Sequence, residues 1–411
     1  MVDELSTGTP ATAPSREAGP TSSTAMYWSA GALGIIATAV AAILPALVGV
    51  WQSQAGLRLD QAGFVGATEL FAQVVGTGAF LWASRRWTLR TIAVAGVSLM
   101  IIGNVATALS VDFSSLILSR AIGGTGGGLI RALCMWCLAK AVSPGRAFAI
   151  YASAQVGLAA VTTAIIPYFI VAHGPRAPFL ALSLVSIIGF ALCPLLPRIS
   201  APSTLAHRRG AGSNPLSAIC AIVALFVYFV GQSALWTYLA PIGAYQSISA
   251  AGVSAALTFL NIAGLTGALG VGALAHRVNP RVALVTLLAI ELVSIVVLFN
   301  SHSSAGFIAS AGAFYFSWCA SVPFQFTIIS QSDRSGRASA VVPAADGLGL
   351  AGGAAFAAMV LPTFGLASAG WVCATASVIG IMLYMTSASL SKRSTHIVQQ
   401  PAEIDAGTLE G

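Results

Sequence analysis

The chain has 411 residues, of which 57% are hydrophobic and only 8% are charged. Soluble domains carry about 25% charged residues, so this composition excludes an ordinary soluble enzyme or binding domain. The apolar residues occur in long blocks, each close to the ~20 residues that a helix needs to cross the hydrocarbon core of a bilayer. We therefore predict a polytopic membrane protein.

The first 26 residues are rich in Ser, Thr, Pro and Ala and show no hydrophobic periodicity. They lack a basic region followed by a short apolar core, so we do not expect a cleaved signal peptide. The segment after residue 390 is similarly polar. Both segments have the composition of disordered tails.

Twelve apolar blocks follow one another between these tails, and short polar breaks separate them. We predict an all-α membrane protein with one transmembrane helix per block. The blocks lie at about 27–50, 62–83, 91–110, 114–139, 148–171, 178–197, 217–240, 251–274, 282–299, 305–329, 339–362 and 370–390.

The basic residues predict the orientation of these spans. Fifteen of the nineteen Lys and Arg residues fall in the tails and in one alternate set of loops, whereas the other loops hold only Arg58 and Arg176. Because cytoplasmic loops carry an excess of Lys and Arg, we expect both tails to be cytoplasmic. The net charge of +7 is then a topology signal, and we do not expect nucleic-acid binding.

The two halves of the chain resemble each other when one is shifted by 191 residues. The segment SRRWTLR (84–90) falls on AHRVNPR (275–281), and GRAFAIYASAQ (145–155) falls on GRASAVVPAAD (336–346). Parallel repeats of this kind are found in transporters whose site lies near the bilayer midplane between the repeats. The matched pairs are Arg86 with Arg277, Arg90 with Arg281, Arg146 with Arg337, and Gln155 with Asp346.

The repeat predicts two pseudo-symmetric six-helix bundles. We place the first bundle at 27–197 and the second at 215–390, with a cytoplasmic linker at 198–214 between them. The tails at 1–26 and 391–411 complete the domain organisation.

Three motifs make the transmembrane region similar to the major facilitator superfamily. The loop GALAHRVNPR (272–281) resembles the pattern G-x-x-x-D-R-x-G-R-R of that family, and its counterpart before span 3 is more degenerate. In span 4, Arg120 is followed by Gly124 and Gly128, as in the family pattern. Within the superfamily the chain looks most like the 12-span drug/proton antiporters. The matching loop positions are candidates for gating: Arg85, Arg86, Arg90, His276, Arg277 and Arg281.

Charged side chains inside the spans are costly and are therefore candidates for function. Glu69 and Arg120 each lie six or seven residues from the outer end of their spans, about 10 Å along a helix, so they could pair. We predict Glu69 as the proton-carrying group and Arg120 as its tuning charge. The alternative is a fixed salt bridge between spans 2 and 4.

A second possible pair lies nearer the cytoplasmic side. Arg131 and Asp346 are each nine residues from a basic residue at that edge, and we include both as candidates for proton coupling. Asp346 could instead meet Arg85 or Arg86. Glu291 lies in the middle of span 9, where it is either protonated or paired with a polar neighbour, and we assign it no role.

The resemblance implies that spans 1, 4, 7 and 10 line the substrate cavity. Spans 7 and 10 mix aromatic side chains with amides and hydroxyls, which suits a moderately apolar or aromatic solute. The alternative for several of these side chains is ordinary packing. The candidates are Tyr228, Gln232, Trp236, Tyr238, Tyr315, Trp318 and Gln325.

We therefore expect a monomeric secondary transporter in the cell membrane that exports small organic solutes in exchange for protons. The rival within this class is a proton-coupled importer of an organic acid, an aromatic compound or a sugar, and a non-transporting receptor is a more distant alternative. We predict no enzyme activity, cofactor or metal site, because the His residues are scattered and the six Cys residues lie inside apolar blocks.

Overall fold

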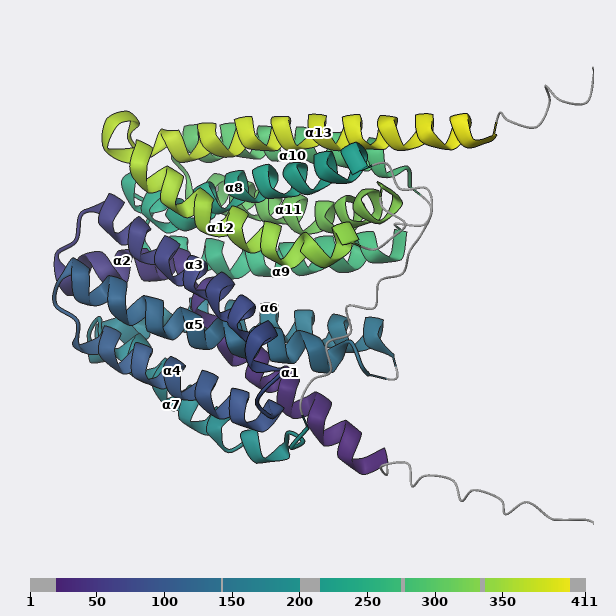
Figure 1. Ribbon diagram of the computed structural model, residues 1–411. Coiled ribbons are helices and arrows are strands. Elements are labelled where there is room, and N and C mark those ends of the chain that lie inside the picture. The colour runs from purple at the N-terminus through teal and green to yellow at the C-terminus, as the bar shows by residue number, and fades with distance from the viewer. Residues whose placement is uncertain (1–19, 142, 200–214, 275–277, 333–336, 400–411) are drawn as a thin grey trace, which may run out of the picture.

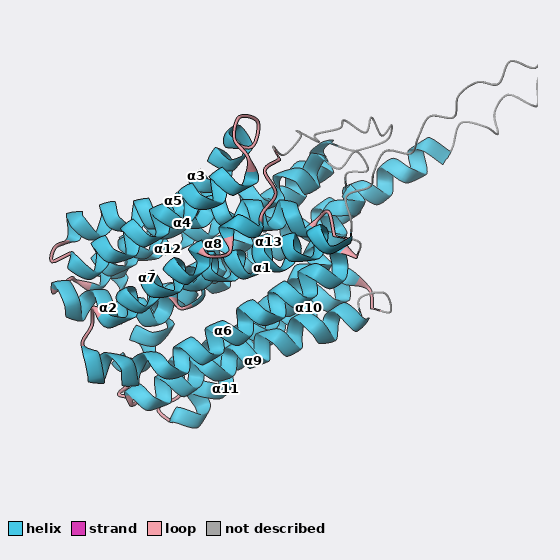
Figure 2. Cartoon of the chain, turned by 90° about the horizontal axis from the view of Figure 1, so that it is seen from below, coloured by secondary structure: helices cyan, strands magenta, loops and turns pink. Residues whose placement is uncertain are grey.

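The computed structural model describes residues 20–141, 143–199, 215–274, 278–332 and 337–399, and these residues are almost entirely helical (Figures 1 and 2). Twelve helical segments in this part of the chain are long and apolar enough to cross a membrane. Where the structure describes the whole connection between two segments, it is short and the two helices run in opposite directions. The prediction of an all-α protein with twelve spans is confirmed.

The first six spans form one bundle. Their helices are α1 (Pro20–Ala42), α2 (Leu44–Ala55), α3 (Leu59–Ala83), α4 (Leu89–Leu109), α5 (Phe113–Leu138), α6 (Pro144–His173) and α7 (Ala177–Phe190), followed by a 3₁₀ turn at Cys193–Leu195. The second bundle consists of α8 (Pro215–Tyr245), α9 (Ala250–Leu274), α10 (Pro280–Asn300), α11 (Ser304–Ser332), α12 (Arg337–Phe364) and α13 (Ala367–Gln399).

Local sequence signals set several helix ends. Asp112 accepts a hydrogen bond from the Ser115 N–H in the first turn of α5, and Asn279 does the same for Arg281 in α10, so each satisfies a helix-end donor. The first span is interrupted at Ile43, between α1 and α2, and Pro45 follows in the first turn of α2. Proline has no N–H to donate, which suits it to a first turn.

Two helices extend into the predicted tails. Helix α1 begins at Pro20, within the segment expected to be disordered, and α13 continues to Gln399, nine residues beyond the predicted end of its span. The rest of both tails and residues 200–214 of the predicted linker lie outside the described residues.

Glycines allow close helix packing inside both bundles. In the first bundle α5 lies against α3, and a Cβ at Gly128 would overlap the backbone carbonyl oxygen of Gln73. In the second bundle α12 lies against α8, and a Cβ at Gly353 would overlap the carbonyl of Val230. Small residues of this kind let membrane helices approach closely, so Gly128 in the span-4 glycine motif has a packing role.

The two bundles meet along three helix pairs. Helix α3 packs against α12, α6 against α9, and α2 against α8; Figure 2 shows α6 and α9 side by side. A hydrogen bond of 2.8 Å from the Ser254 hydroxyl to the backbone carbonyl of Thr163 joins the second pair. The pseudo-symmetric arrangement therefore places the interface of the bundles at the centre of the protein.

The bundles are closed against each other at one end only. We call the end that holds the predicted cytoplasmic loops, including Arg85 and Lys140, the basic end, and the other the opposite end. At the opposite end one hydrophobic cluster joins both bundles, with Trp51 from α2 beside residues such as Leu239 from α8. Toward the basic end each bundle has a separate core, and the ribbons diverge there in Figure 1.

Candidate functional site

A buried ion pair joins α3 and α5 in the first bundle. The Arg120 Nη1 donates to the Glu69 Oε2 over 3.4 Å, and the two side chains are 0% and 2% exposed. The sequence placed both residues at the same depth, and the structure brings them into contact. Removing either partner would leave the other charge uncompensated, which is far more costly inside a protein than at its surface.

Neutral groups hold the Arg120 guanidinium on its remaining sides. Its Nε donates to the Thr107 hydroxyl over 2.8 Å, and its Nη2 donates to the Asn104 Oδ1 over 2.9 Å. Both acceptors belong to α4, so the guanidinium ties three helices together. Its Cζ also lies 5.7 Å from the centre of the Phe179 ring of α7. Arg120 is therefore fixed in one geometry, with Glu69 as its single anionic partner among the described residues.

Gln73 connects this pair to the centre of the protein. It lies one turn after Glu69 on α3 and donates a hydrogen bond of 3.1 Å to the Glu69 Oε1. Gln73 also lines a cavity between the bundles. The carboxyl of Glu69 is thus one hydrogen bond away from a side chain that lines the cavity.

The central cavity has a volume of about 220 Å³. Residues from eight membrane spans line it, four spans from each bundle, where α1 and α2 together make up the first span. All four spans that the family resemblance named contribute, and α3, α6, α9 and α12 contribute as well. Among the described residues that line it, Arg131 alone is charged. The polar lining side chains are Thr38, Gln73, Arg131, Gln155, Ser233 and Asn261.

The second bundle contributes three aromatic rings to the cavity. Trp236 from α8 stacks on Tyr315 from α11, with ring centroids 4.9 Å apart and planes 21° from parallel. Trp318 meets Tyr315 edge-on at 5.3 Å. All three residues line the cavity, so three of the seven predicted substrate candidates line this cavity.

The other four substrate candidates lie away from the cavity. Tyr228, Gln232 and Gln325 belong to a hydrogen-bond network inside the second bundle. Tyr238 lies at the opposite end, where its hydroxyl is pressed against Gly63 of α3. It therefore helps to close the bundles against each other, and the expectation that it lines a pocket is not met.

The network of the second bundle surrounds Glu291, to which the sequence assigned no role. Its carboxyl accepts hydrogen bonds from Tyr228 at 3.0 Å, from Gln232 at 2.8 Å and from Ser377 at 2.6 Å. The side chain is 1% exposed, and no cation lies within 4 Å of it in the described part of the chain. The spacing of Tyr228 and Gln232, one helical turn apart, is the sequence signal that could have found this cluster.

Arg131 and Asp346 come from different bundles and lie within electrostatic reach of each other. No ion pair joins them at 4.0 Å or less among the described residues. The Asp346 Oδ1 is buried without a hydrogen-bond partner in the described residues. The predicted pair is therefore close without being in direct contact.

Two of the gating candidates perform matching structural roles. The Arg90 Nε donates to the carbonyl of Leu196 over 3.1 Å, near the end of the sixth span. The Arg281 Nη2 donates to the carbonyl of Ala388 over 2.5 Å, near the same point of the twelfth span. Arg85 and Arg86 are exposed. The remaining candidates, His276 and Arg277, lie outside the described residues.

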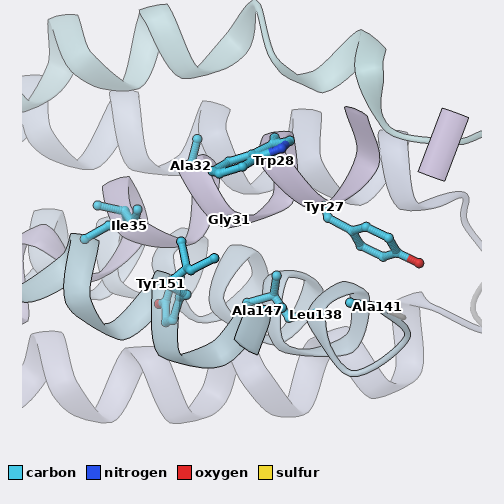
Figure 3. A pocket seen from close by; sticks show the side chains of 11 residues that line it. Tyr27, Trp28, Gly31, Ala32, Ile35, Leu138, Ala141, Ala147 and Tyr151 are labelled. Carbon is cyan, nitrogen blue, oxygen red and sulfur yellow. The ribbon is translucent and has the colours of Figure 1, made fainter. Parts of the chain in front are cut away.

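A second cavity, of about 340 Å³, lies between α1, the end of α5 and α6, on the side of the basic end (Figure 3). Its lining is almost wholly apolar and includes Trp28, Ile35 and Leu138. In Figure 3 the Tyr27 hydroxyl points away from the other labelled side chains. It donates a hydrogen bond of 2.8 Å to the backbone carbonyl of Lys140. This cavity offers little for recognition of a polar solute.

Comparison with known proteins agrees with the architecture. The family model described as Major Facilitator Superfamily matches residues 29–332, which extend from α1 through α11. The chain belongs to the major facilitator superfamily. A search of curated protein sequences finds no match.

Solved structures of this superfamily share the fold. The chain is similar to the inward-open conformation of the xylose transporter XylE from E. coli, with a TM-score of 0.69 and 15% identity over 87% of this chain and 95% of that one. It is also similar to a D-xylose-proton symporter, with a TM-score of 0.71 and 15% identity over 89% and 97% of the two chains. Identities this low bear on the fold alone. The resemblance to drug/proton antiporters therefore stays a prediction for this superfamily member.

Proposed function

We propose that this major facilitator superfamily transporter moves small organic solutes across the cell membrane by alternating access, coupled to protons. The observation that carries the proposal is the connection from the Glu69–Arg120 pair through Gln73 to the central cavity. A carboxyl that binds and releases a proton next to a solute cavity can link the two movements. Glu69 is the proton carrier in this proposal, and Arg120 holds it in place.

The orientation follows from the positive-inside rule. With the basic end in the cytoplasm, the separate cores at that end and the shared cluster at the other correspond to an inward-facing state. The cycle then requires the outer cluster to part and the two inner cores to meet. Tyr238 against Gly63 is one of the contacts that would open.

Two directions of transport use the same pair. The sequence favoured efflux in exchange for protons. Uptake together with protons is the second candidate, favoured by the fold neighbour described as a D-xylose-proton symporter. A carboxyl that is protonated on one side of the membrane and deprotonated on the other can serve both cycles. If solute and proton bind together, the two move in the same direction; if they bind in turn, they are exchanged.

The test uses the purified transporter in vesicles that contain a pH-sensitive dye. Benzoate, xylose and the organic cation ethidium are added in turn outside, and the internal pH is followed against empty vesicles. We expect one class of solute to produce a proton flux that empty vesicles do not show. Acidification of the lumen indicates symport and alkalinisation indicates exchange. A labelled solute that accumulates with no response to an imposed proton gradient would contradict the proposal.

A further inference from the structure

The central cavity contains a cation, Arg131, that no anion contacts directly in the part of the chain that the structure describes. Arg131 projects from α5 into the cavity lining, and among the described residues it has neither a hydrogen-bond partner nor an ion-pair partner. Intramembrane charges normally pair with another group. Guanidinium groups form their strongest contacts with carboxylates, through two parallel hydrogen bonds. An unpaired arginine in a solute cavity therefore favours an anionic solute.

The aromatic residues lie on the other bundle. Trp236, Tyr315 and Trp318 form one packed cluster whose rings line the same cavity. Offset stacked and edge-on contacts between rings stabilise an aromatic guest beyond the burial of its area. A solute that touched both Arg131 and this cluster would bridge the two bundles, which is where a rocking transporter must sense its cargo.

The size of the cavity favours a small solute. Pockets for drug-sized ligands usually measure about 300–1,000 Å³, and this cavity measures about 220 Å³. One ring and a short charged group fit this size better than a fused polycyclic drug. The amides of Gln73, Gln155 and Asn261 in the lining can bind hydroxyl groups on such a ring. A single arginine suits one carboxylate and gives no second cation for a dicarboxylate or a phosphate ester.

We propose that the central cavity binds a small aromatic monocarboxylate, with Arg131 binding the carboxylate and the cluster of Trp236, Tyr315 and Trp318 packing on the ring. This assignment rests on the transport function proposed above and names its substrate class. Asp346 of α12 lies within electrostatic range of Arg131 without forming an ion pair with it, so its carboxylate competes with that of the solute.

The test is equilibrium binding of benzoate to the full-length protein in detergent. Calorimetry and tryptophan fluorescence measure the binding. Benzamide has the same ring without the charge, cyclohexanecarboxylate has the charge without the aromatic ring, and xylose represents a neutral sugar. We expect saturable benzoate binding and an affinity for benzamide that is lower by about 10–100-fold, the range for loss of a charged hydrogen-bonded contact. Cyclohexanecarboxylate should bind more weakly than benzoate.

Variants connect the affinities to the named residues. Arg131→Gln should weaken benzoate binding by about 10–100-fold and leave benzamide binding unchanged. The matched control is Arg146→Gln, because Arg146 is exposed and does not line the cavity. Trp236→Leu should weaken benzoate more than cyclohexanecarboxylate. If Arg131→Gln does not fold, Arg131→Lys keeps the charge without the planar fork and should retain part of the affinity.

Three results would overturn the assignment: equal affinities for benzoate and benzamide, benzoate binding that is unchanged in a folded Arg131→Gln, or saturable binding of xylose alone. These outcomes are separable from failure of the transport proposal. If another solute drives a proton flux in vesicles while benzoate does not bind, only the substrate class is wrong. If benzoate binds through Arg131 and no solute drives a proton flux, the site is correct and the coupling is wrong.

Discussion

Each bundle buries a glutamate among the described residues, and the two glutamates are held in different ways. In the first bundle Glu69 contacts the guanidinium of Arg120 and a glutamine that lines the central cavity. In the second bundle Glu291 is bound by hydroxyl and amide groups from α8 and α13. The first arrangement balances charge and leads to the cavity, whereas the second joins helices of one bundle.

The difference suggests a division of roles. The network around Glu291 continues through Tyr228 and Ser321 to Gln325 and Tyr384, so it connects α8, α10, α11 and α13. Such a network stabilises these four helices against one another. Glu69 and Arg120 lie beside the moving interface, since Gln73 follows on the same helix and faces the cavity. This difference supports the proposal that protons are coupled through the first bundle, while the network of the second bundle stabilises its helices.

The largest effect is expected from breaking the charged pair. Arg120→Gln leaves Glu69 buried without a cation, and loss of one partner of a buried pair costs about 3–5 kcal/mol of the free energy of unfolding. Glu69→Gln should cost a similar amount. The double variant should recover much of the loss, because it leaves no uncompensated charge. Unfolding in detergent micelles measures all three, and strictly additive losses would contradict a direct interaction between the two side chains.

A smaller effect is expected from filling the close helix contact that each bundle has at a glycine. Gly128→Ala places a methyl group on the Gln73 carbonyl, and Gly353→Ala places one on the Val230 carbonyl. Overpacking of this kind costs about 1–3 kcal/mol. The matched control is Gly157→Ala in α6, where an added Cβ meets nothing within 4 Å. Equal melting temperatures for all three variants would show that close packing at the two contacts does not matter.

Glu291→Gln tests the glutamate of the second bundle. The amide oxygen can replace Oε1, which accepts from Gln232 and Ser377, and the amide N–H then faces the Tyr228 oxygen. No cation loses its partner, so the expected cost is about 1 kcal/mol. Proton-coupled transport should persist. The measurement combines unfolding with the vesicle assay. Tyr228→Phe is the control that removes the hydroxyl, with its hydrogen bonds to Glu291 and Ser321, and keeps the Glu291 carboxyl. Loss of coupling in Glu291→Gln, with normal folding, would place a proton site in the second bundle.

The smallest effect is expected at an exposed pair. Arg58 and Asp60 form an ion pair of 2.8 Å at the start of α3, and the Arg58 side chain is 69% exposed. Surface pairs contribute about 0–1 kcal/mol, so Arg58→Gln should change the free energy of unfolding far less than Arg120→Gln. The same replacement at the two arginines isolates the effect of burial. A loss at Arg58 as large as at Arg120 would contradict this view of the buried pair.

The architecture could be predicted from the sequence, and so could the Glu69 site, whereas the Glu291 site could not. Span length and loop charge predicted twelve helices, and the depth of Glu69 and Arg120 predicted their contact. The structure also shows what two matched residues of the sequence repeat do. Arg90 and Arg281 donate hydrogen bonds to backbone carbonyls at corresponding points of the two bundles. These features depend on position along a helix, which sequence counting measures well.

The cavity lining was predicted less well, because it depends on which way each helix faces. Lipid and protein interior are both apolar, so hydrophobic periodicity does not separate the two faces of a membrane helix. Tyr228 and Trp236 share α8 and similar chemistry, yet the first binds Glu291 and the second lines the cavity. Gln73 and Asn261 were missed for the same reason, although amides inside spans 2 and 8 were visible.

Coupling in the double variant Glu69→Gln/Arg120→Gln tests the central claim most directly. The solute with the largest proton flux is measured in vesicles in two modes, accumulation driven by a proton gradient and exchange of labelled for unlabelled solute without one. We predict that the folded double variant still exchanges solute and no longer accumulates it when the gradient is imposed. Accumulation equal to that of the unmodified protein would contradict the assignment of proton coupling to this pair.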